Sequence, residues 1–101
     1  MGTITQSIIM NILGKEKLHA FKQRHADVRS QVDAWEAEVS VVKWCTPQDI
    51  KQRYASASFL ADNIVIFNLK GVKYRLKTKV NYPYEAVLII NAGTHNEYTH
   101  W

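Results

Sequence analysis

The second half of the chain alternates between polar and apolar positions with a period of two, which is the side-chain period of a β-strand. From Lys73 to Val80 every other residue is Lys or Arg, and Tyr, Leu, Thr and Val stand between them. The alternation predicts a strand over residues 72–80, with its cations on one face. Two more apolar, β-branched runs, 64–69 and 85–91, are also predicted as strands. The connections are short, so we expect an antiparallel meander.

In the first half, apolar residues recur every three or four positions, as they do on one face of a helix. A first helix is expected over residues 15–25. Asp27 is predicted to cap a second helix, because a carboxylate there accepts hydrogen bonds from the free backbone N–H groups. The apolar stripe of this second helix is assigned to the core and consists of Val28, Val32, Trp35 and Val39.

A third helix is predicted from the residues that start it. Thr46 is a capping residue, Pro47 fits the first helical position, and Asp49 places an acid in the first turn. The helix is expected to end near Tyr54. Most of residues 55–61 are small, either Ala or Ser, and we predict a loop there.

Each end of the chain adds a short element. Residues 1–13 mix Thr with β-branched residues, which favours a short edge strand near 10–13. Thr94 followed three residues later by Glu97 has the form of a capping box, in which each side chain bonds the backbone N–H of the other residue. We therefore expect one or two final helical turns towards Trp101.

These elements predict a single α+β domain over residues 1–101, in which N-terminal helices pack on one face of a three- or four-stranded antiparallel sheet. Because the helices require the apolar face, the opposite face is left open. The side chains expected on this open face are Lys73, Arg75, Lys77 and Lys79.

Charge sharpens this picture. The net charge is +4, but residues 70–79 alone hold five Lys or Arg and no acid, while the rest of the chain has eight basic against nine acidic residues. A row of like charges repels itself, so an anion that neutralises it is the expected partner, and phosphate is the first candidate.

The sequence offers little for other chemistry. Cys45 is the only cysteine, which excludes an intrachain disulfide and favours a reducing compartment. The apolar run at 8–13 is too short to span a membrane. Neither the histidine spacings 19/25 and 95/100 nor the single cysteine suits a zinc site, so we predict no metal and no cofactor.

A series of motifs appears in a fixed order along the chain: Ala34-Trp35, Trp44, Pro47 to Tyr54, Ala57-Ser58, Phe67-Asn68-Leu69-Lys70-Gly71, Lys73-Tyr74-Arg75-Leu76 with Lys79, and Gly93-Thr94-His95 with Glu97-Tyr98. From Met10 to Tyr98 the chain resembles the HigB toxins, within the RelE-like group of bacterial toxin–antitoxin systems. It departs from their pattern at Val72, where an Asn often stands, and at Thr99, where an Asp is usual. Residues 1–9 have no counterpart, which leaves Met1 and Met10 as alternative starts.

The resemblance implies a cytoplasmic enzyme, an mRNA interferase that cleaves codons on the translating ribosome without a catalytic metal. It also implies silencing by a cognate HigA-like antitoxin with a helix-turn-helix fold. This partner would either cover the basic face or prevent entry into the ribosome. Operator DNA is expected to be contacted only through the antitoxin complex, and no membrane is involved.

Under this interpretation four residues are predicted to be catalytic. Arg75 would clamp the phosphate with its planar fork, and Lys79 would add charge beside it. His95 would act as acid or base, since the ordinary pKa of an imidazole is about 6.5. Its place at a helix N-terminus would also bring backbone N–H groups close to an anion. Tyr98 would stack a base or share proton transfer.

Lys73, Lys77 and Tyr82 are predicted to bind RNA. Each of these assignments has an ordinary structural alternative: a solvated sheet face for the lysines and packing in a turn for Tyr82. Glu97 is expected to serve the capping box first and catalysis only secondarily. Two other functions also stay open, namely a non-catalytic inhibitor such as the gyrase-poisoning RelE-related toxins, and a degenerate module that binds RNA or antitoxin.

Overall fold

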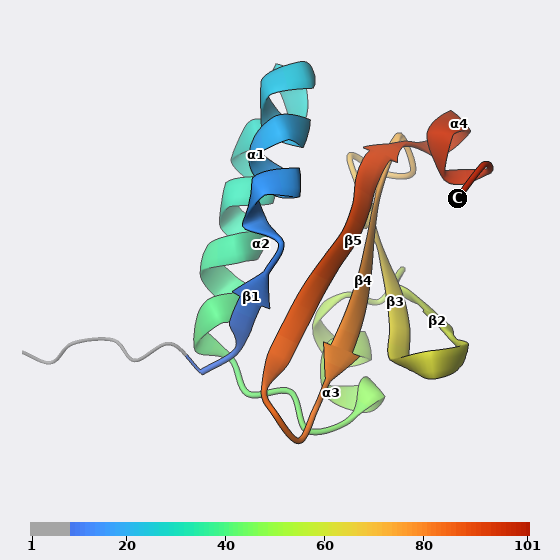
Figure 1. The fold of residues 1–101 in the computed structure, drawn as a ribbon. Coiled ribbons are helices and arrows are strands. Elements are labelled where there is room, and N and C mark those ends of the chain that lie inside the picture. Colours follow the sequence, from blue (N-terminus) through green and yellow to red (C-terminus); the bar gives the residue numbers. More distant parts are fainter. Residues whose placement is uncertain (1–8) are drawn as a thin grey trace, which may run out of the picture.

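The computed structural model describes residues 9–101, and its centre is a five-stranded sheet in the order β1-β5-β4-β3-β2 (Figure 1). The strands are β1 (Asn11–Leu13), β2 (Ser58–Leu60), β3 (Ile64–Leu69), β4 (Tyr74–Asn81) and β5 (Ala86–Thr94). All neighbours are antiparallel except β1, which runs parallel to β5. No helix among the described residues is long and apolar enough to cross a membrane.

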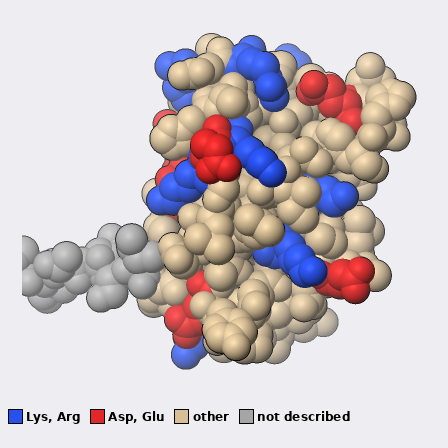
Figure 2. Space-filling view, in the orientation of Figure 1, with Lys and Arg blue, Asp and Glu red and all other residues tan. Residues whose placement is uncertain are grey.

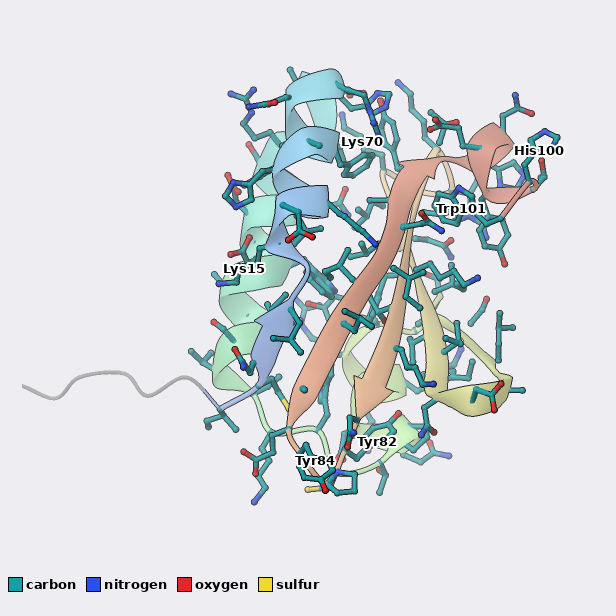
Figure 3. The ribbon with its side chains drawn as sticks, viewed as in Figure 1. Lys15, Lys70, Tyr82, Tyr84, His100 and Trp101 are labelled. Carbon is teal, nitrogen blue, oxygen red and sulfur yellow. The ribbon has the colours of Figure 1, made fainter. Side chains whose placement is uncertain are left out.

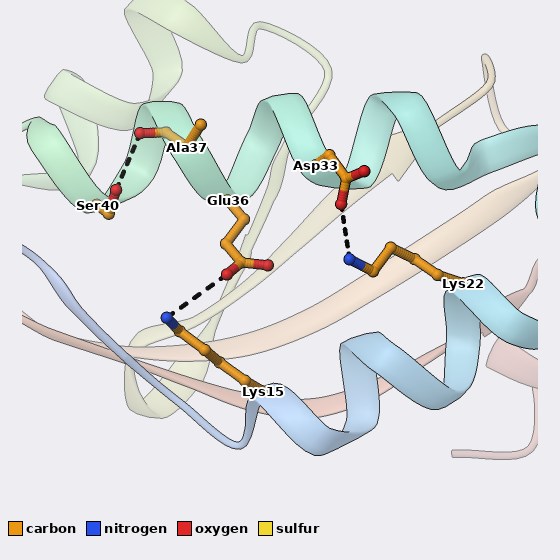
Figure 4. A network of polar contacts seen from close by, with 6 residues as sticks. All are labelled: Lys15, Lys22, Asp33, Glu36, Ala37 and Ser40. Atoms are coloured by element: carbon orange, nitrogen blue, oxygen red, sulfur yellow. Dashed lines mark hydrogen bonds and ion pairs between the residues drawn. The ribbon is translucent and has the colours of Figure 1, made fainter.

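Two long helices, α1 (Lys15–Arg24) and α2 (Arg29–Val41), lie together on one face of this sheet, and α3 (Pro47–Arg53) follows them (Figure 1). Ion pairs tie α1 to α2: Lys22 Nζ lies 2.6 Å from Asp33, and Lys15 Nζ lies 3.5 Å from Glu36 (Figure 4). The predicted stripe of Val28, Val32, Trp35 and Val39 is buried in the core, as expected.

The predicted α+β class is confirmed, but the sheet is larger than expected. β2 lies inside the segment that we predicted as a loop, and its three residues are too few for a periodic signal. β1 appears where an edge strand was expected, yet it pairs in parallel with β5 rather than joining the antiparallel meander. Gly14 makes the turn into α1 with φ 82°, and a Cβ there would come within 2.9 Å of the Ile89 carbonyl oxygen.

The prediction for Asp27 is wrong. A 3-10 turn, η1 (Ala26–Val28), precedes α2, and the N-cap of α2 is Val28, with no side-chain hydrogen bond. The Asp27 carboxylate instead accepts hydrogen bonds from Tyr74 Oη at 2.7 Å and Lys73 Nζ at 3.0 Å. Lys73 and Tyr74, which are 46 and 47 residues away in the sequence, thus bind the carboxylate that the local sequence predicted to cap α2.

Candidate anion-binding site

Strand β4 presents the predicted alternation, with Tyr74, Leu76, Thr78 and Val80 buried against the helices. The opposite face of the sheet, which we call the open face, carries Arg75, Lys77 and Lys79 from β4. Arg75 and Lys77 are half-buried, whereas Lys79 is exposed. The cations therefore stand in a line along one central strand, flanked by β3 and β5.

The short helix α4 (His95–Tyr98) closes this line at the end where β4 begins. Its capping box is formed as predicted: Thr94 Oγ1 accepts from the Glu97 N–H at 3.1 Å, and Glu97 Oε1 accepts from the Thr94 N–H at 2.8 Å. The hydrogen bond from the Thr94 backbone holds the pKa of Glu97 below its ordinary value. The Glu97 carboxylate thus serves the cap of α4.

The aromatic side chains of this C-terminal turn gather beside Arg75. The Arg75 guanidinium lies 4.9 Å from the centre of the Tyr98 ring, within the range of a cation–π contact. The Tyr98 ring is 6.4 Å from His95 and nearly parallel to it, and 5.5 Å from Trp101 edge to face. The structure therefore brings three of the predicted catalytic residues, Arg75, His95 and Tyr98, into one cluster.

Gly93 allows this turn to fold back over the open face. It pairs with Arg75 across the sheet, and a Cβ at this position would lie 2.5 Å from Glu97 Oε1 and 3.2 Å from Trp101 Cζ2. Sequence reasoning gave no role to Trp101. The one signal available in the sequence was the position of Trp101 three residues after Tyr98, which places it about one helical turn further on.

One expected feature of His95 is absent. Its backbone N–H donates to the Lys73 carbonyl oxygen at 2.9 Å, so this N–H is not free for an anion. The hydrogen bond instead anchors α4 to the turn before β4. The exposed imidazole is left as the part of His95 that can act on a ligand.

The cations of the open face keep their charge uncompensated. Five ion pairs form within residues 9–101, and none of them uses Arg75, Lys77 or Lys79. Arg75 Nε is also buried with no hydrogen-bond partner in the described part of the chain. A bound anion would satisfy these groups, since unpaired charges near a surface attract counter-ions.

Lys73 does not belong to this set. It precedes β4, and its ammonium pairs with Asp27 at 3.0 Å, away from the open face. The hydrogen bond with Asp27 raises the pKa of Lys73. In the view of Figure 2, blue side chains are separated by tan surface and by red acidic groups.

Tyr82 lies at the opposite end of the sheet from the C-terminal turn (Figure 3). It follows the last residue of β4 and packs, partly buried, against the hydrophobic core. Burial raises the pKa of its hydroxyl, as does the nearby Asp49 carboxylate. Tyr82 is thus separated from the other predicted site residues. Its position agrees with the alternative given for it, namely packing in a turn.

The site is a surface and not a deep cavity. A hollow of about 430 Å³ lies between α2 and α3, and none of the predicted site residues lines it. Within residues 9–101, no three His, Cys, Asp or Glu side chains gather closely enough to hold a metal ion. The arrangement can bind a phosphate at Arg75, add charge from Lys77 and Lys79, and offer an imidazole and aromatic faces beside it.

A small basic α+β domain with unpaired cations and an aromatic cluster on an open sheet face is a class of protein suited to nucleic acid. Residues 28–101 match the family model HigB_toxin, described as the RelE-like toxic component of a toxin-antitoxin system. Because this match covers most of the chain, the chain belongs to that family. The matched range begins at Val28, later than the resemblance noted from Met10. No curated protein matches the chain.

Proposed function

We propose that the chain is a ribosome-dependent endoribonuclease that cleaves translated mRNA in the cytoplasm and is neutralised by a cognate HigA-like, helix-turn-helix antitoxin. Membership of a family of toxic components supports this direction. The observation that carries it is the Arg75 guanidinium, which has no acidic partner within residues 9–101 and lies 4.9 Å from Tyr98.

Cleavage by this arrangement would use the 2′-hydroxyl of the RNA. That oxygen attacks the adjacent phosphorus, a base removes its proton, and the bond from phosphorus to the 5′-oxygen breaks as an acid protonates the leaving oxygen. The products are a 2′,3′-cyclic phosphate and a 5′-hydroxyl. Positioned acid–base groups typically contribute about 10²–10⁴-fold in rate.

Each residue of the cluster has a place in this scheme. Arg75 binds two non-bridging oxygens and stabilises the extra charge of the phosphorane, a kind of contact typically worth roughly 3–4 kcal/mol. His95 exchanges a proton with the 2′-oxygen or the 5′-oxygen. Tyr98 holds the guanidinium in place and offers its ring to a base, while Lys77 and Lys79 attract the flanking phosphates.

The test is a reconstituted translation reaction in which new mRNA 5′ ends are mapped. Wild-type protein should cut at defined codon positions only when ribosomes are present, and Arg75→Ala and His95→Ala should each lower the cleavage rate at least about a hundredfold. Lys73→Ala is the matched control, because its ammonium is paired with Asp27, and it should cut at close to the wild-type rate.

Intact mRNA with excess wild-type protein would overturn this proposal. The remaining candidate is then a non-catalytic inhibitor that uses the same face. The unpaired cations support this function as well as they support cleavage, because both require binding of an anionic target. It is distinguished by His95→Ala, which would leave inhibition of growth unchanged.

A further inference from the structure

A row of mostly apolar side chains crosses all five strands on the open face and passes β4 at Lys79, four residues after Arg75. The register of the sheet pairs Leu13 with Leu88, Leu88 with Lys79, Lys79 with Ile64, and Ile64 with Leu60. Cross-strand partners lie on the same face, so all five side chains stand side by side on the face that carries Arg75. We call these five residues the apolar row.

The apolar row is open to solvent. Leu13, Leu60 and Leu88 are 46%, 49% and 42% exposed, and Ile64 is half-buried. Within residues 9–101, these three leucines make up half of the large apolar residues that are exposed. Single exposed leucines are common on protein surfaces, but a contiguous set on one face marks a contact surface.

The chemistry of the row excludes phosphate as its main ligand and specifies a protein. Four of its five side chains are aliphatic, and these gain free energy by leaving water for an apolar neighbour. Lys79 stands in the middle and has no acidic partner in the described part of the chain. A partner that covers the leucines must also supply a carboxylate, because an ammonium buried without a counter-charge is costly.

We propose that the apolar row is the docking site of an acidic amphipathic helix from the cognate antitoxin, an inference that rests on the proposed function. Five strands about 4.8 Å apart make the row about 19 Å long, which corresponds to roughly 13 residues of helix. Leu88 and Ile64 lie on either side of Lys79, each one strand away from it. The matching helix therefore has apolar residues at i and i+7 and Asp or Glu at i+3 or i+4.

Docking at the row would cover the lysines at one end of the candidate site. Arg75 and Lys79 are four residues apart on β4, or about 13 Å, and a helix with its side chains is about 10–12 Å wide. A helix centred on Lys79 therefore extends about 5–6 Å along β4 to either side, which brings it to the edge of Lys77, about 7 Å away, and leaves Arg75 outside. Antitoxin and RNA would then compete for the same lysines.

Titration calorimetry with the cognate antitoxin tests this inference. Leu60→Ser and Leu88→Ser should each weaken binding at least tenfold, because each removes a side chain that the complex buries. Val72→Ser is the matched control: Val72 is 60% exposed but lies in the turn before β4, outside the row, and its loss should leave binding unchanged. Thermal unfolding of each variant verifies that the fold is intact.

Three results would overturn the docking site. The leucine variants could bind antitoxin as tightly as wild type, Val72→Ser could weaken binding as much as they do, or the leucine variants could dissolve a dimer of the free chain instead. A loss of ribosome-dependent cleavage by Leu88→Ser with antitoxin binding intact would assign the row to RNA or to the ribosome and likewise reject the proposal.

The cleavage assay without antitoxin separates the two proposals. Leu88→Ser should cleave at the wild-type rate, since Leu88 takes no part in the cluster at Arg75. If wild-type protein fails to cleave while the leucine variants still lose antitoxin, the proposed function fails and the docking site stands.

Discussion

Asp27 is the residue where distant contacts changed a local assignment most clearly. Its carboxylate accepts hydrogen bonds from Tyr74 and Lys73, and the bond from the Tyr74 hydroxyl is the largest cause that lowers the pKa of Asp27. The same contacts fix the start of β4, since Tyr74 also packs between Phe21 and His25, with ring centres 5.5 and 4.9 Å away. Asp27 thus joins η1 to the sheet next to the candidate site.

This arrangement predicts an acid-dependent stability. A carboxyl with a lowered folded-state pKa stabilises the protein above its ordinary value of about 3.9, and this contribution is lost as the pH falls through the folded-state pKa. Asp27→Asn should therefore lower the urea midpoint at pH 7, and the difference from wild type should shrink in acid. Tyr74→Phe should act in the same direction.

Urea unfolding of wild type and variants at pH 7 and near pH 3 measures the effect. Glu16→Gln provides the control, because Glu16 is exposed on α1 and belongs to none of the ion pairs of the described region. A difference between wild type and Asp27→Asn that stays constant over this range would contradict the role given to Asp27.

At the scale of elements, the candidate site depends on α4, which has only four residues and no buried residue of its own. Isolated helices of this length are not stable in water, so α4 relies on its capping box, on the His95 N–H bond to Lys73, and on the packing of Trp101 over Gly93. The position of Tyr98 beside Arg75 is therefore set by the cap.

Removal of the cap should uncouple the site without unfolding the protein. Thr94→Ala deletes the oxygen that accepts the Glu97 N–H, a loss that typically costs about 1 kcal/mol. Amide exchange over residues 95–101 should become roughly fivefold faster, and ribosome-dependent cleavage should fall, while the midpoint of global unfolding changes little. Thr94→Ser keeps the hydroxyl and should restore both. Unchanged cleavage by Thr94→Ala would show that α4 does not position the site.

At the scale of the whole molecule, the distribution of paired and unpaired cations matters more than the net charge of +4. Lys15, Lys22, Lys43, Arg53 and Lys73 are each paired with an acid. On the open face, Arg75, Lys77 and Lys79 stand together on β4 and form no ion pair within residues 9–101, and Lys79 also belongs to the apolar row. The same face thus combines a site for phosphate with a surface suited to protein.

The salt dependence of RNA binding should report this distribution. For single-stranded RNA the slope of log K against log salt is about −0.7 per phosphate neutralised, so Arg75, Lys77 and Lys79 predict a slope of about −2. Lys79→Ala should reduce it to about −1.4, whereas Lys73→Ala should leave it unchanged because Asp27 already neutralises Lys73. Fluorescence anisotropy with a 2′-O-methyl RNA, which cannot be cleaved, measures both. An equal reduction by Lys73→Ala would show that the ion pair with Asp27 is not maintained.

The sequence by itself determined those features that depend on residues two to four positions apart. The alternation from Lys73 to Val80 fixed the strand β4 and the face of Arg75, and the spacing of Thr94 and Glu97 fixed the cap of α4. The stripe of α2 was likewise readable. In each case the side chains that interact, or share a face, are neighbours along the chain, so local geometry alone places them.

Only the tertiary structure decided which distant residues became neighbours. It paired β1 with β5, added β2 to the edge of the sheet, and drew Asp27 and Lys73 together. It also placed Trp101 over Gly93 and aligned four aliphatic side chains from four strands in one row. The physical reason is strand register: a shift of one residue would turn every side chain of a strand to the other face, and no local pattern specifies that register between segments far apart in the chain.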